Sequence, residues 1–553
     1  MSISHEDVRY NVLNKLRKSI LDGIDYIRKN DPQLYFKMSK ELEEYRKIID
    51  KGQLIPLVVK NERFIKGIGK PDIEVFGGKI IIEVKVKPSE FAEGYSKLCD
   101  YIQFYPYAEF AIITNYQDWE FYRVENGKLK PSGTLDLDYI VRTVMIRGIK
   151  LPLSTENVKN MFKPLILLES ELHKIFKSHI EKIEALYEAY RNIIKRLYEK
   201  ASEVEVENLF VRHTLMQMIV SSCLTAALEK ITTSLKACSG AEIEAEIVLP
   251  YLNWWERIIR QMDSSSRAFM NSLFDSVYSR AMLLDWKSGQ KEDVFRELYE
   301  ILIDADTRRR IGEYYTPLWL VEYMIDKISK DIGGLKAKIV LDPFCGSGTF
   351  LVISFYKKIE EGEDPDDAIK EVVGFDINPL AVSIARAELM IAYQKVRRGP
   401  VTPLIFNADS ASLLLRSPVE WKPSSFLEEL KTIEELIKYV DYPLHKPTKI
   451  DFSEILKIEM ILREHFKEIS LINNVKKELT KRLVRLHDEE WKGALTVHII
   501  KTLSNEKCID AVSRLIEKYG NGVWAVSITS LFAPHIIRKL GVDIVVTNPP
   551  WRF

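Results

Sequence analysis

The sequence of residues 338–350 is Lys-Ile-Val-Leu-Asp-Pro-Phe-Cys-Gly-Ser-Gly-Thr-Phe, and this stretch decides the fold of the chain around it. An apolar run at 338–341 leads into a loop with two glycines, and residues 351–358 have a helical pattern. The stretch predicts a strand, a glycine loop and a helix. Glycines let a backbone approach a ligand closely, and open α/β sheets bind nucleotides at the carboxyl ends of their parallel strands. We therefore expect a nucleotide-like ligand at this loop.

Two further predicted strands end in acidic residues. The strand at 372–375 ends in Asp376 and is followed by a helix at 380–390, and the strand at 404–406 leads to Asp409. A carboxylate at the first position can accept both hydroxyls of a ribose. A carboxylate at the second can accept a hydrogen bond from the exocyclic amine of an adenine ring. Three strand ends are thus expected to line one nucleoside in a Rossmann-like, doubly wound core.

The motif Asn548-Pro549-Pro550-Trp551 follows an apolar strand at 543–547. Each component suits the methylation of an exocyclic amine, which is a poor nucleophile because its lone pair is delocalised into the ring. Acceptors on its two protons, the Asn548 amide oxygen and the Pro549 carbonyl, favour the tetrahedral form that attacks. Trp551 can stack on a base that has been extruded from the duplex. The motif predicts base methylation.

Three motifs together resemble gamma-class adenine-N6 DNA methyltransferases. They are Gly-Glu-Tyr-Tyr-Thr-Pro at 312–317, Asp-Pro-Phe-Cys-Gly-Ser-Gly-Thr at 342–349 and Asn-Pro-Pro-Trp at 548–551. They resemble, in this order, the N-terminal, cofactor and catalytic motifs of that class, over residues 306–410 and 541–553. RNA and protein-glutamine methyltransferases also share Asn-Pro-Pro, so the base specificity rests on the resemblance.

The resemblance implies S-adenosylmethionine as the cofactor and gives each motif residue a role. Asp376 is expected on the ribose and Asp409 on the adenine of the cofactor. The remaining cofactor residues are expected near its methionine part, Tyr315, Thr316 and Pro317, and under it, Asp342, Gly346 and Gly348. The separation of the cofactor and catalytic motifs is longer than is usual in this class. Later sheet strands and a target-recognition domain are also missing, so we expect a C-terminally incomplete methyltransferase, with a second chain as one source of the missing parts.

A second constellation lies near the N-terminus. Pro71-Asp72 is followed by Glu83-Val84-Lys85, and Gly77-Gly78 between them predicts a two-residue hairpin turn. Such a turn places Asp72 opposite Glu83, with Lys85 on the same face. Two opposed carboxylates suit a divalent cation such as Mg²⁺, which would activate water while the lysine positions the nucleophile. The other face is an apolar row of Ile73, Val75, Ile80, Ile82, Val84 and Val86.

This spacing resembles the PD-(D/E)xK site of restriction-endonuclease domains. Glu6, in a segment similar to their opening helix, is the candidate third metal ligand beside Asp72 and Glu83, with Glu43 and Glu44 as weaker options. Residues 113–115 with Trp119 resemble their following strand, and Lys97 stands where many of these enzymes carry glutamine. The alternative is a half-buried hairpin whose outer face is solvated.

The whole chain is predicted to be a multidomain α/β protein. We expect a PD-(D/E)xK nuclease-like α/β domain at 1–150, a helical spacer at 151–305 and the cofactor-binding part of the methyltransferase core at 306–410. A mostly helical insertion at 411–540 then separates that core from the catalytic strand at 541–553.

The composition restricts the partners and the setting. Eighty basic and eighty acidic residues cancel, so a surface for double-stranded DNA must be local. The five cysteines show no metal-ligand spacing and no disulfide framework. The absence of a signal peptide and of a long apolar run predicts a soluble, cytoplasmic protein without a membrane partner.

The leading hypothesis is a single-chain restriction-modification enzyme that resembles type IIG enzymes, with adenine-N6 methylation and Mg²⁺-dependent cleavage of DNA in one polypeptide. One alternative keeps the methyltransferase and makes the N-terminal domain an inactive DNA-binding module of a defence system. Another makes the chain a non-catalytic subunit that a second polypeptide completes.

Overall fold

The structure is a computed structural model in which two compact units are distinguished. It describes residues 4–50, 59–61, 71–197, 201–230, 232–241, 243, 249, 251–289, 293–302, 316–399, 401–408, 474–488, 500, 503–519 and 542–549. Unit 1 comprises 1–175, 229–238 and 260–290, and unit 2 comprises 176–228, 239–259 and 291–553. Four predicted site residues lie outside the described residues: Tyr315, Asp409, Pro550 and Trp551. None of the described helices is long and apolar enough to cross a membrane.

Unit 1 contains a sheet of six strands in sequence order. Only β3 and β4 run parallel, and α3 (Phe91–Phe104) connects them, whereas every other neighbouring pair is antiparallel. The strands are β1 (Val59–Asn61), β2 (Ile73–Val75), β3 (Ile80–Val84), β4 (Phe110–Thr114), β5 (Trp119–Glu125) and β6 (Lys128–Pro131).

The β2–β3 hairpin has the predicted register. Glu74 pairs with Ile81, and continuing this antiparallel ladder by two residues sets Asp72 against Glu83. The last paired residues are Val75 and Ile80, and three successive residues between them have positive φ, 51° at Phe76, 67° at Gly77 and 96° at Gly78. The connection is thus longer than the predicted two-residue turn, since it runs from Phe76 to Lys79, but it keeps the predicted register and aligns the two acidic positions.

Both faces of this hairpin are buried, so the alternative of a solvated outer face is wrong. On the apolar face Val86 alone is partly exposed, and the fully buried residues are Ile73, Val75, Ile80, Ile82 and Val84. On the opposite face Glu83 is 3% exposed and Asp72 is 7% exposed. Buried carboxylates are costly unless they are paired or bind a cation, which makes this face a candidate site.

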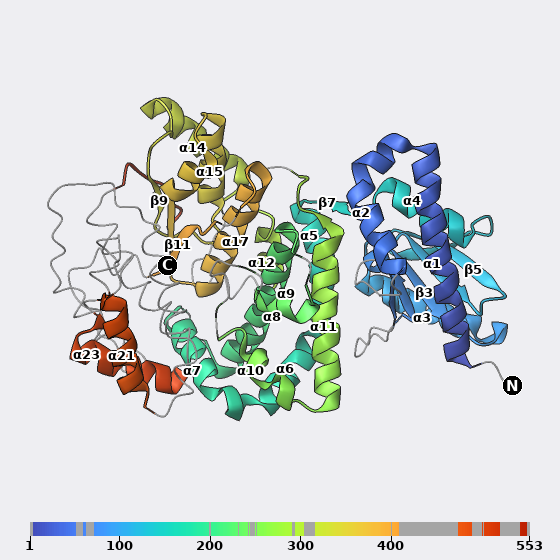
Figure 1. The fold of residues 1–553 in the computed structure, drawn as a ribbon, viewed down its shortest axis with the longest axis horizontal. Coiled ribbons are helices and arrows are strands. Elements are labelled where there is room, and N and C mark those ends of the chain that lie inside the picture. The colour runs from blue at the N-terminus through green and yellow to red at the C-terminus, as the bar shows by residue number, and fades with distance from the viewer. Residues whose placement is uncertain are drawn as a thin grey trace. The chain divides into compact units, whose positions relative to one another are not determined.

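Helices cover the sheet of unit 1. Figure 1 shows α1 (His5–Asn30), α2 (Pro32–Asp50) and α4 (Leu137–Arg147) together beside the sheet. Ser4 caps α1, because its hydroxyl accepts from the Asp7 N–H and the Asp7 carboxylate accepts from the Ser4 N–H. The other elements of unit 1 include β7 (Leu151–Pro152), α5 (Thr155–Phe162), α11 (Ser264–Leu283) and β8 (Leu284–Asp285).

One of these helices, α11, comes from the stretch predicted as a spacer, yet it packs inside unit 1. Its Arg280 is fully buried and donates to the carbonyl of Phe104, with 2.7 Å between the Nη2 and O atoms. The same guanidinium lies 4.2 Å from the centre of the Phe104 ring. A buried cation held by a carbonyl and an aromatic face ties α11 to the end of α3.

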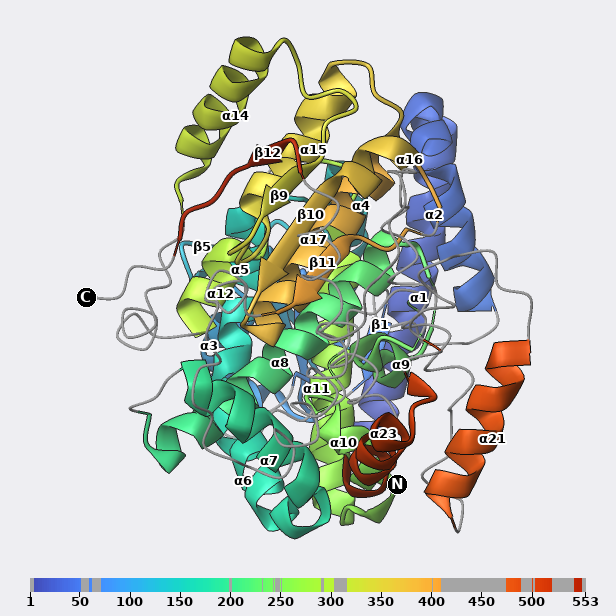
Figure 2. The same cartoon turned by 90° about the vertical axis from the view of Figure 1, so that its left-hand side faces the viewer.

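Unit 2 contains four parallel strands in the order β11-β10-β9-β12 (Figure 2). This agrees with the parallel strands predicted from the glycine loop and the acidic strand ends. Because the strands are parallel, their carboxyl ends meet at one edge. They are β9 (Val340–Asp342), β10 (Val372–Asp376), β11 (Leu404–Asn407) and β12 (Ile544–Val545).

Three helices form one layer against these strands: α14 (Leu318–Ile332), α15 (Thr349–Glu360) and α17 (Pro379–Val396). One apolar cluster joins α14 and α15 to β9 and β12, and another joins α15 and α17 to β10 and β11. Since α15 belongs to both clusters, these helices lie on the same face. The second helical layer of the doubly wound prediction remains a prediction.

A helix of the predicted spacer also belongs to unit 2. Helix α8 (Glu203–Ala227) packs along α17, and the Ser383 hydroxyl donates to Gln217, at 3.2 Å between oxygens. The predicted insertion is helical at α21 (Val475–Asp488) and α23 (Glu506–Tyr519). Further helices of unit 2 are α7 (Ile180–Leu197), α10 (Trp254–Ile258), α12 (Arg296–Leu302) and α16 (Pro365–Ala368). Helix α9 (Ser234–Ser239) lies in unit 1 up to residue 238, and α6 (Glu169–Ser178) spans the boundary between the units at residue 175.

Candidate functional site

The glycine loop between β9 and α15 is held by acidic side chains at the strand ends. The Phe344 N–H donates to Asp342 Oδ1 at 3.1 Å, and the Gly346 N–H donates to Asp376 Oδ2 at 2.9 Å. The Cys345 N–H donates to the Phe375 carbonyl at 2.8 Å. The two carboxylates that the sequence predicted near the cofactor therefore also shape the loop.

The surroundings of these two carboxylates favour their protonated forms. Burial raises the pKa of Asp342 to about 7, against which hydrogen bonds from Thr547 and Phe344 act. Burial raises the pKa of Asp376 to about 6, although the N–H groups of Asn378 and Gly346 oppose this. Hydroxyl groups of a bound ligand would donate to the ionised forms and lower both pKa values again.

The two loop glycines have different surroundings. A methyl group on Gly346, at φ 53°, would meet no atom within 4 Å, so the space beside this backbone is open. A methyl group on Gly348, at φ 90°, would lie 2.9 Å from the Ala385 Cβ. Gly346 thus lets a ligand approach the backbone, whereas Gly348 lets α15 and α17 pack closely. An open glycine backbone beside a partly exposed Asp376 fits the ribose end of a nucleoside cofactor.

The strand β12 brings the start of the catalytic motif to the same edge. Val545 pairs with Leu341, and the Val546 N–H donates to the Leu341 carbonyl at 3.0 Å. Asp543 secures the beginning of this strand, because its Oδ2 accepts from the Ile339 N–H at 2.8 Å. Asn548 consequently follows a strand directly beside the one that ends in Asp342.

Two of the remaining predicted cofactor residues, Thr316 and Pro317, are among the described residues. Pro317 caps the start of α14, and its carbonyl accepts from the N–H groups of Leu320 and Val321. Val321 packs against Val340 of β9, so Thr316 and Pro317 enter the unit beside this strand.

Sequence reasoning missed two asparagines that join the strand ends. Asn378 caps α17 and donates its amide to the Tyr299 hydroxyl at 3.0 Å. Asn407 donates its amide to the carbonyls of Asp376 and Ile377, both at 2.9 Å. The Asn378-Pro379 pair before an apolar helix predicts a helix N-cap. The residues next to Asn407 in the sequence, by contrast, do not predict its role.

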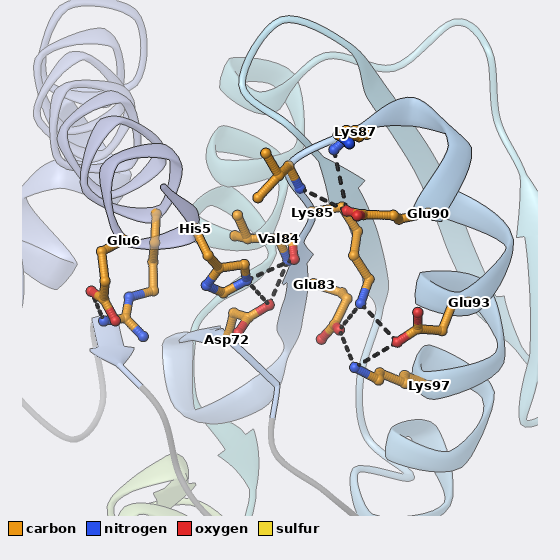
Figure 3. A network of polar contacts seen from close by, with 12 residues as sticks. His5, Glu6, Asp72, Glu83, Val84, Lys85, Lys87, Glu90, Glu93 and Lys97 are labelled. Carbon is orange, nitrogen blue, oxygen red and sulfur yellow. Dashed lines mark hydrogen bonds and ion pairs between the residues drawn. The ribbon is translucent and has the colours of Figure 1, made fainter. Parts of the chain in front are cut away.

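In unit 1 the structure brings together Asp72, Glu83 and Lys85 at the predicted nuclease-like site (Figure 3). The Lys85 Nζ lies 3.0 Å from Glu83 Oε1. Asp72 Oδ2 accepts from the Val84 N–H at 2.7 Å. Burial raises the pKa of Glu83, and the charge of Asp72 raises it further, while Lys85 opposes both effects. Because these two buried carboxylates repel each other, a bound cation would stabilise them.

Glu6 does not join this cluster. It pairs with Arg9 of its own helix, and its side chain is 70% exposed. The preceding residue, His5, takes the position beside the hairpin. Its Nε2 lies 3.6 Å from Asp72 Oδ2 and 3.0 Å from the Val84 carbonyl oxygen (Figure 3). Of the weaker options, Glu43 accepts from the Tyr35 hydroxyl, and the side chain of Glu44 lies outside the described residues.

Lys97, the noted departure from the resemblance, completes an ion cluster on the other side of Glu83. Its Nζ lies 3.4 Å from Glu83 Oε1 and 3.0 Å from Glu93 Oε1. Lys85 contacts the same Glu93 oxygen at 3.3 Å (Figure 3). Two lysines therefore share one oxygen of Glu83.

The second carboxylate oxygen of Glu83, Oε2, is the candidate ligand of a metal ion. Glu83 Oε2 is buried and has no hydrogen-bond partner within the described part of the chain. A buried carboxylate oxygen without a donor is a suitable ligand for a hard divalent cation. Among the described residues, however, no cluster of three acidic, histidine or cysteine side chains has the geometry of a metal site. Asp72 and Glu83 are the two carboxylates here that could hold a divalent cation.

The chain is similar to known proteins over part of its length. Residues 290–401 match the family described as N-6 DNA methylase. The methylase subunit of the type I restriction enzyme EcoEI from Escherichia coli is 30% identical over 101 residues, which is 18% of this chain and 20% of the relative. The methylase subunit of MjaIX from Methanocaldococcus jannaschii is 30% identical over 108 residues, covering 19% of this chain and 18% of the relative. The adenine-specific methyltransferase PglX of Streptomyces coelicolor is 32% identical over 110 residues, 17% of this chain and 9% of the relative.

The matches thus span about a fifth of the length of the first two relatives. Residues 290–401 are therefore similar to the N-6 DNA methylase family. Two solved structures are also similar, at low overall scores. A DrdV–DNA complex has a TM-score of 0.31 and 14% identity, covering 71% of this chain and 40% of that one. The type IIG restriction endonuclease BpuSI has a TM-score of 0.23 and 13% identity, covering 79% and 52%.

Proposed function

We propose that this chain methylates the N6 amine of adenine in double-stranded DNA, with S-adenosylmethionine as the methyl donor, as part of a restriction-modification enzyme. The observation that carries the proposal is the meeting of Asp342, Asp376 and Asn548 at one edge of four parallel strands. The open backbone of Gly346 donates its N–H to Asp376 and follows Asp342 by four residues.

When bound, S-adenosylmethionine supplies an electrophilic methyl group on a sulfonium. The residues proposed to hold it are Asp376 on the ribose, Asp409 on the adenine, Asp342 with the glycine loop under it, and Tyr315, Thr316 and Pro317 near its methionine part. Asp376 can accept hydroxyl protons while it still accepts the loop N–H, because each carboxylate oxygen has two lone pairs.

The methyl acceptor would be held by the catalytic motif. The amide oxygen of Asn548 and the carbonyl of Pro549 would accept the two amine protons, which draws the lone pair out of the ring and towards the methyl group. Trp551, after Pro550, would stack on the extruded base. These acceptors act on the transition state, so their loss should lower kcat more than the affinity for the cofactor.

Transfer of labelled methyl groups from S-adenosylmethionine tests this proposal. We expect transfer to adenine in a duplex, and its loss in Asn548→Ala with the cofactor affinity retained. Transfer only to RNA or to protein would contradict the proposal. Transfer that appears only after a second polypeptide is added would favour the alternative in which another chain completes the domain.

We also propose Mg²⁺-dependent cleavage of DNA by unit 1. The observation that favours it is the buried pair of Asp72 and Glu83, with Oε2 of Glu83 left without a donor among the described side chains. These two carboxylates would hold the metal ion, which activates water and neutralises charge on the phosphate. Lys85, bonded to the other Glu83 oxygen, would orient the attacking water.

Cleavage of duplex DNA by the full chain with Mg²⁺ tests the nuclease. Asp72→Ala and Glu83→Ala should abolish it while binding of S-adenosylmethionine survives. Glu6→Ala is the matched control, because Glu6 pairs with Arg9 and does not reach the two acids. Unchanged cleavage by either hairpin variant would remove the nuclease assignment and favour an inactive DNA-binding module.

A further inference from the structure

A buried carboxylate outside all of the motifs reaches the glycine loop. Asp293 precedes α12 and is 5% exposed. Its Oδ2 accepts from the hydroxyls of both Ser347 and Thr349, the latter at 2.8 Å. Its Oδ1 accepts from the Arg296 N–H at 3.1 Å, which caps the start of α12. One side chain thus connects a helix start with two positions of the loop.

The position of the two hydroxyls explains why this contact matters. Ser347 lies between the two glycines, and Thr349 is the first residue of α15. The loop N–H groups of Phe344 and Gly346 are already taken by Asp342 and Asp376. Asp293 therefore holds the side chains of the same loop whose backbone the two strand-end acids hold.

A second buried acid supports Asp293. Glu388 of α17 is 2% exposed, and its Oε1 accepts from the Phe295 N–H at 2.8 Å. Burial raises the pKa of Glu388, and the charge of Asp293 raises it further, whereas Phe295 and Lys395 oppose these effects. The surroundings therefore favour the protonated form of Glu388, which holds the Phe295 N–H two residues after Asp293.

We propose that Asp293 is a positioning residue of the cofactor site, which fixes Ser347 and Thr349 and thereby sets the conformation of Gly346 for S-adenosylmethionine. The inference rests on the proposed binding of this cofactor. It adds a residue that lies outside the motifs and more than fifty positions upstream in the sequence, at the start of α12.

Equilibrium dialysis of the full chain with labelled S-adenosylmethionine tests the role. Asp293→Ala should weaken binding by roughly tenfold, because both loop hydroxyls lose their acceptor. Asp293→Asn keeps one oxygen for these hydroxyls, so we expect binding within about threefold of the wild type. Ser329→Ala is the matched control. It removes a hydroxyl that donates to Glu361 in the same unit but away from the loop, and it should leave binding unchanged.

A second set of variants keeps the test valid if Asp293→Ala does not fold. The double variant Ser347→Ala/Thr349→Val removes the donors instead of the acceptor and should weaken binding as much. Adding Asp293→Asn to it should have little further effect, since the contact is already lost. Circular dichroism identifies the folded variants.

The outcomes separate this inference from the proposed function. Failure of the wild type to bind S-adenosylmethionine would overturn the proposed function. Binding by the wild type together with equally tight binding by Asp293→Ala would overturn the role of Asp293 alone. Equal weakening by Asp293→Asn and Ser329→Ala would also overturn it, because a loss of general stability would then explain both.

Discussion

Alanine at the two loop glycines should separate stability from cofactor binding. The structure gives Gly348 a φ of 90° and an alanine methyl only 2.9 Å from the Ala385 Cβ. It gives Gly346 a φ of 53° and no neighbour within 4 Å of such a methyl. The same substitution therefore meets a helix backbone at one position and open space at the other.

The magnitudes follow from these surroundings. A left-handed conformation costs a non-glycine residue about 1–2 kcal/mol, and overpacking adds about 1–3 kcal/mol. We expect Gly348→Ala to destabilise unit 2 by about 2–5 kcal/mol and Gly346→Ala by about 1–2 kcal/mol. These values correspond to falls in Tm of about 10 °C and about 3 °C. For cofactor affinity the expected order is reversed, because a methyl on Gly346 occupies the space beside the ligand-facing backbone.

Differential scanning calorimetry with and without S-adenosylmethionine measures both effects, since the transition that the cofactor shifts belongs to unit 2. Gly333→Ala, at the C-cap of α14 with φ 78° and no close neighbour, is the control for backbone strain alone. An equal fall in Tm for Gly346→Ala and Gly348→Ala would contradict this expectation. Equal affinity of Gly346→Ala and Gly333→Ala for the cofactor would also contradict it.

Three further outcomes are expected. The raised pKa of Asp342, about 7, contributes stability below pH 4 that is lost as the pH rises through this pKa. Between pH 4 and pH 8 the free energy of unfolding of Asp342→Asn, measured in denaturant, should therefore rise by up to about 4 kcal/mol relative to that of the wild type. Arg280→Met leaves the buried Phe104 carbonyl without its donor, so calorimetry should show unit 1 destabilised by about 2–3 kcal/mol and unit 2 unchanged. Lys97→Met removes a cation 3.4 Å from Glu83 and should tighten Mg²⁺ binding roughly tenfold by titration calorimetry, an expectation that equal affinity would contradict.

Local patterns were sufficient for the strands and their alignment. The Gly77-Gly78 turn and the alternation of apolar residues predicted the register that opposes Asp72 and Glu83, because a short turn leaves a hairpin few alternatives. The glycine loop and Asp376 predicted neighbouring parallel strands for a similar reason. Each of these signals lies within a few residues of the structure that it specifies.

Contacts between segments far apart in the chain could not be predicted from such local patterns. Glu6 was predicted beside the two acids, but His5 occupies that place. Successive residues of a helix differ in direction by about 100°, so the rotation of α1 against the hairpin decides which one reaches it. Arg280 likewise reaches Phe104 from a stretch that resembled a plain helical spacer, and its apolar-periodic helix carried no sign of a buried cation.

The sequence by itself determined which candidate groups this protein has: the strand-end acids, the glycine loop, the Asn548 motif and the opposed acids of the hairpin. These depend on residue types at short spacings, which local backbone preferences convert into turns and strand ends. The tertiary structure decided what surrounds them, namely the burial of Glu83, the two lysines on one of its oxygens and the reach of Asp293 to the loop. Those properties depend on how helices far apart in the chain pack, and packing is set by the whole core rather than by any one segment.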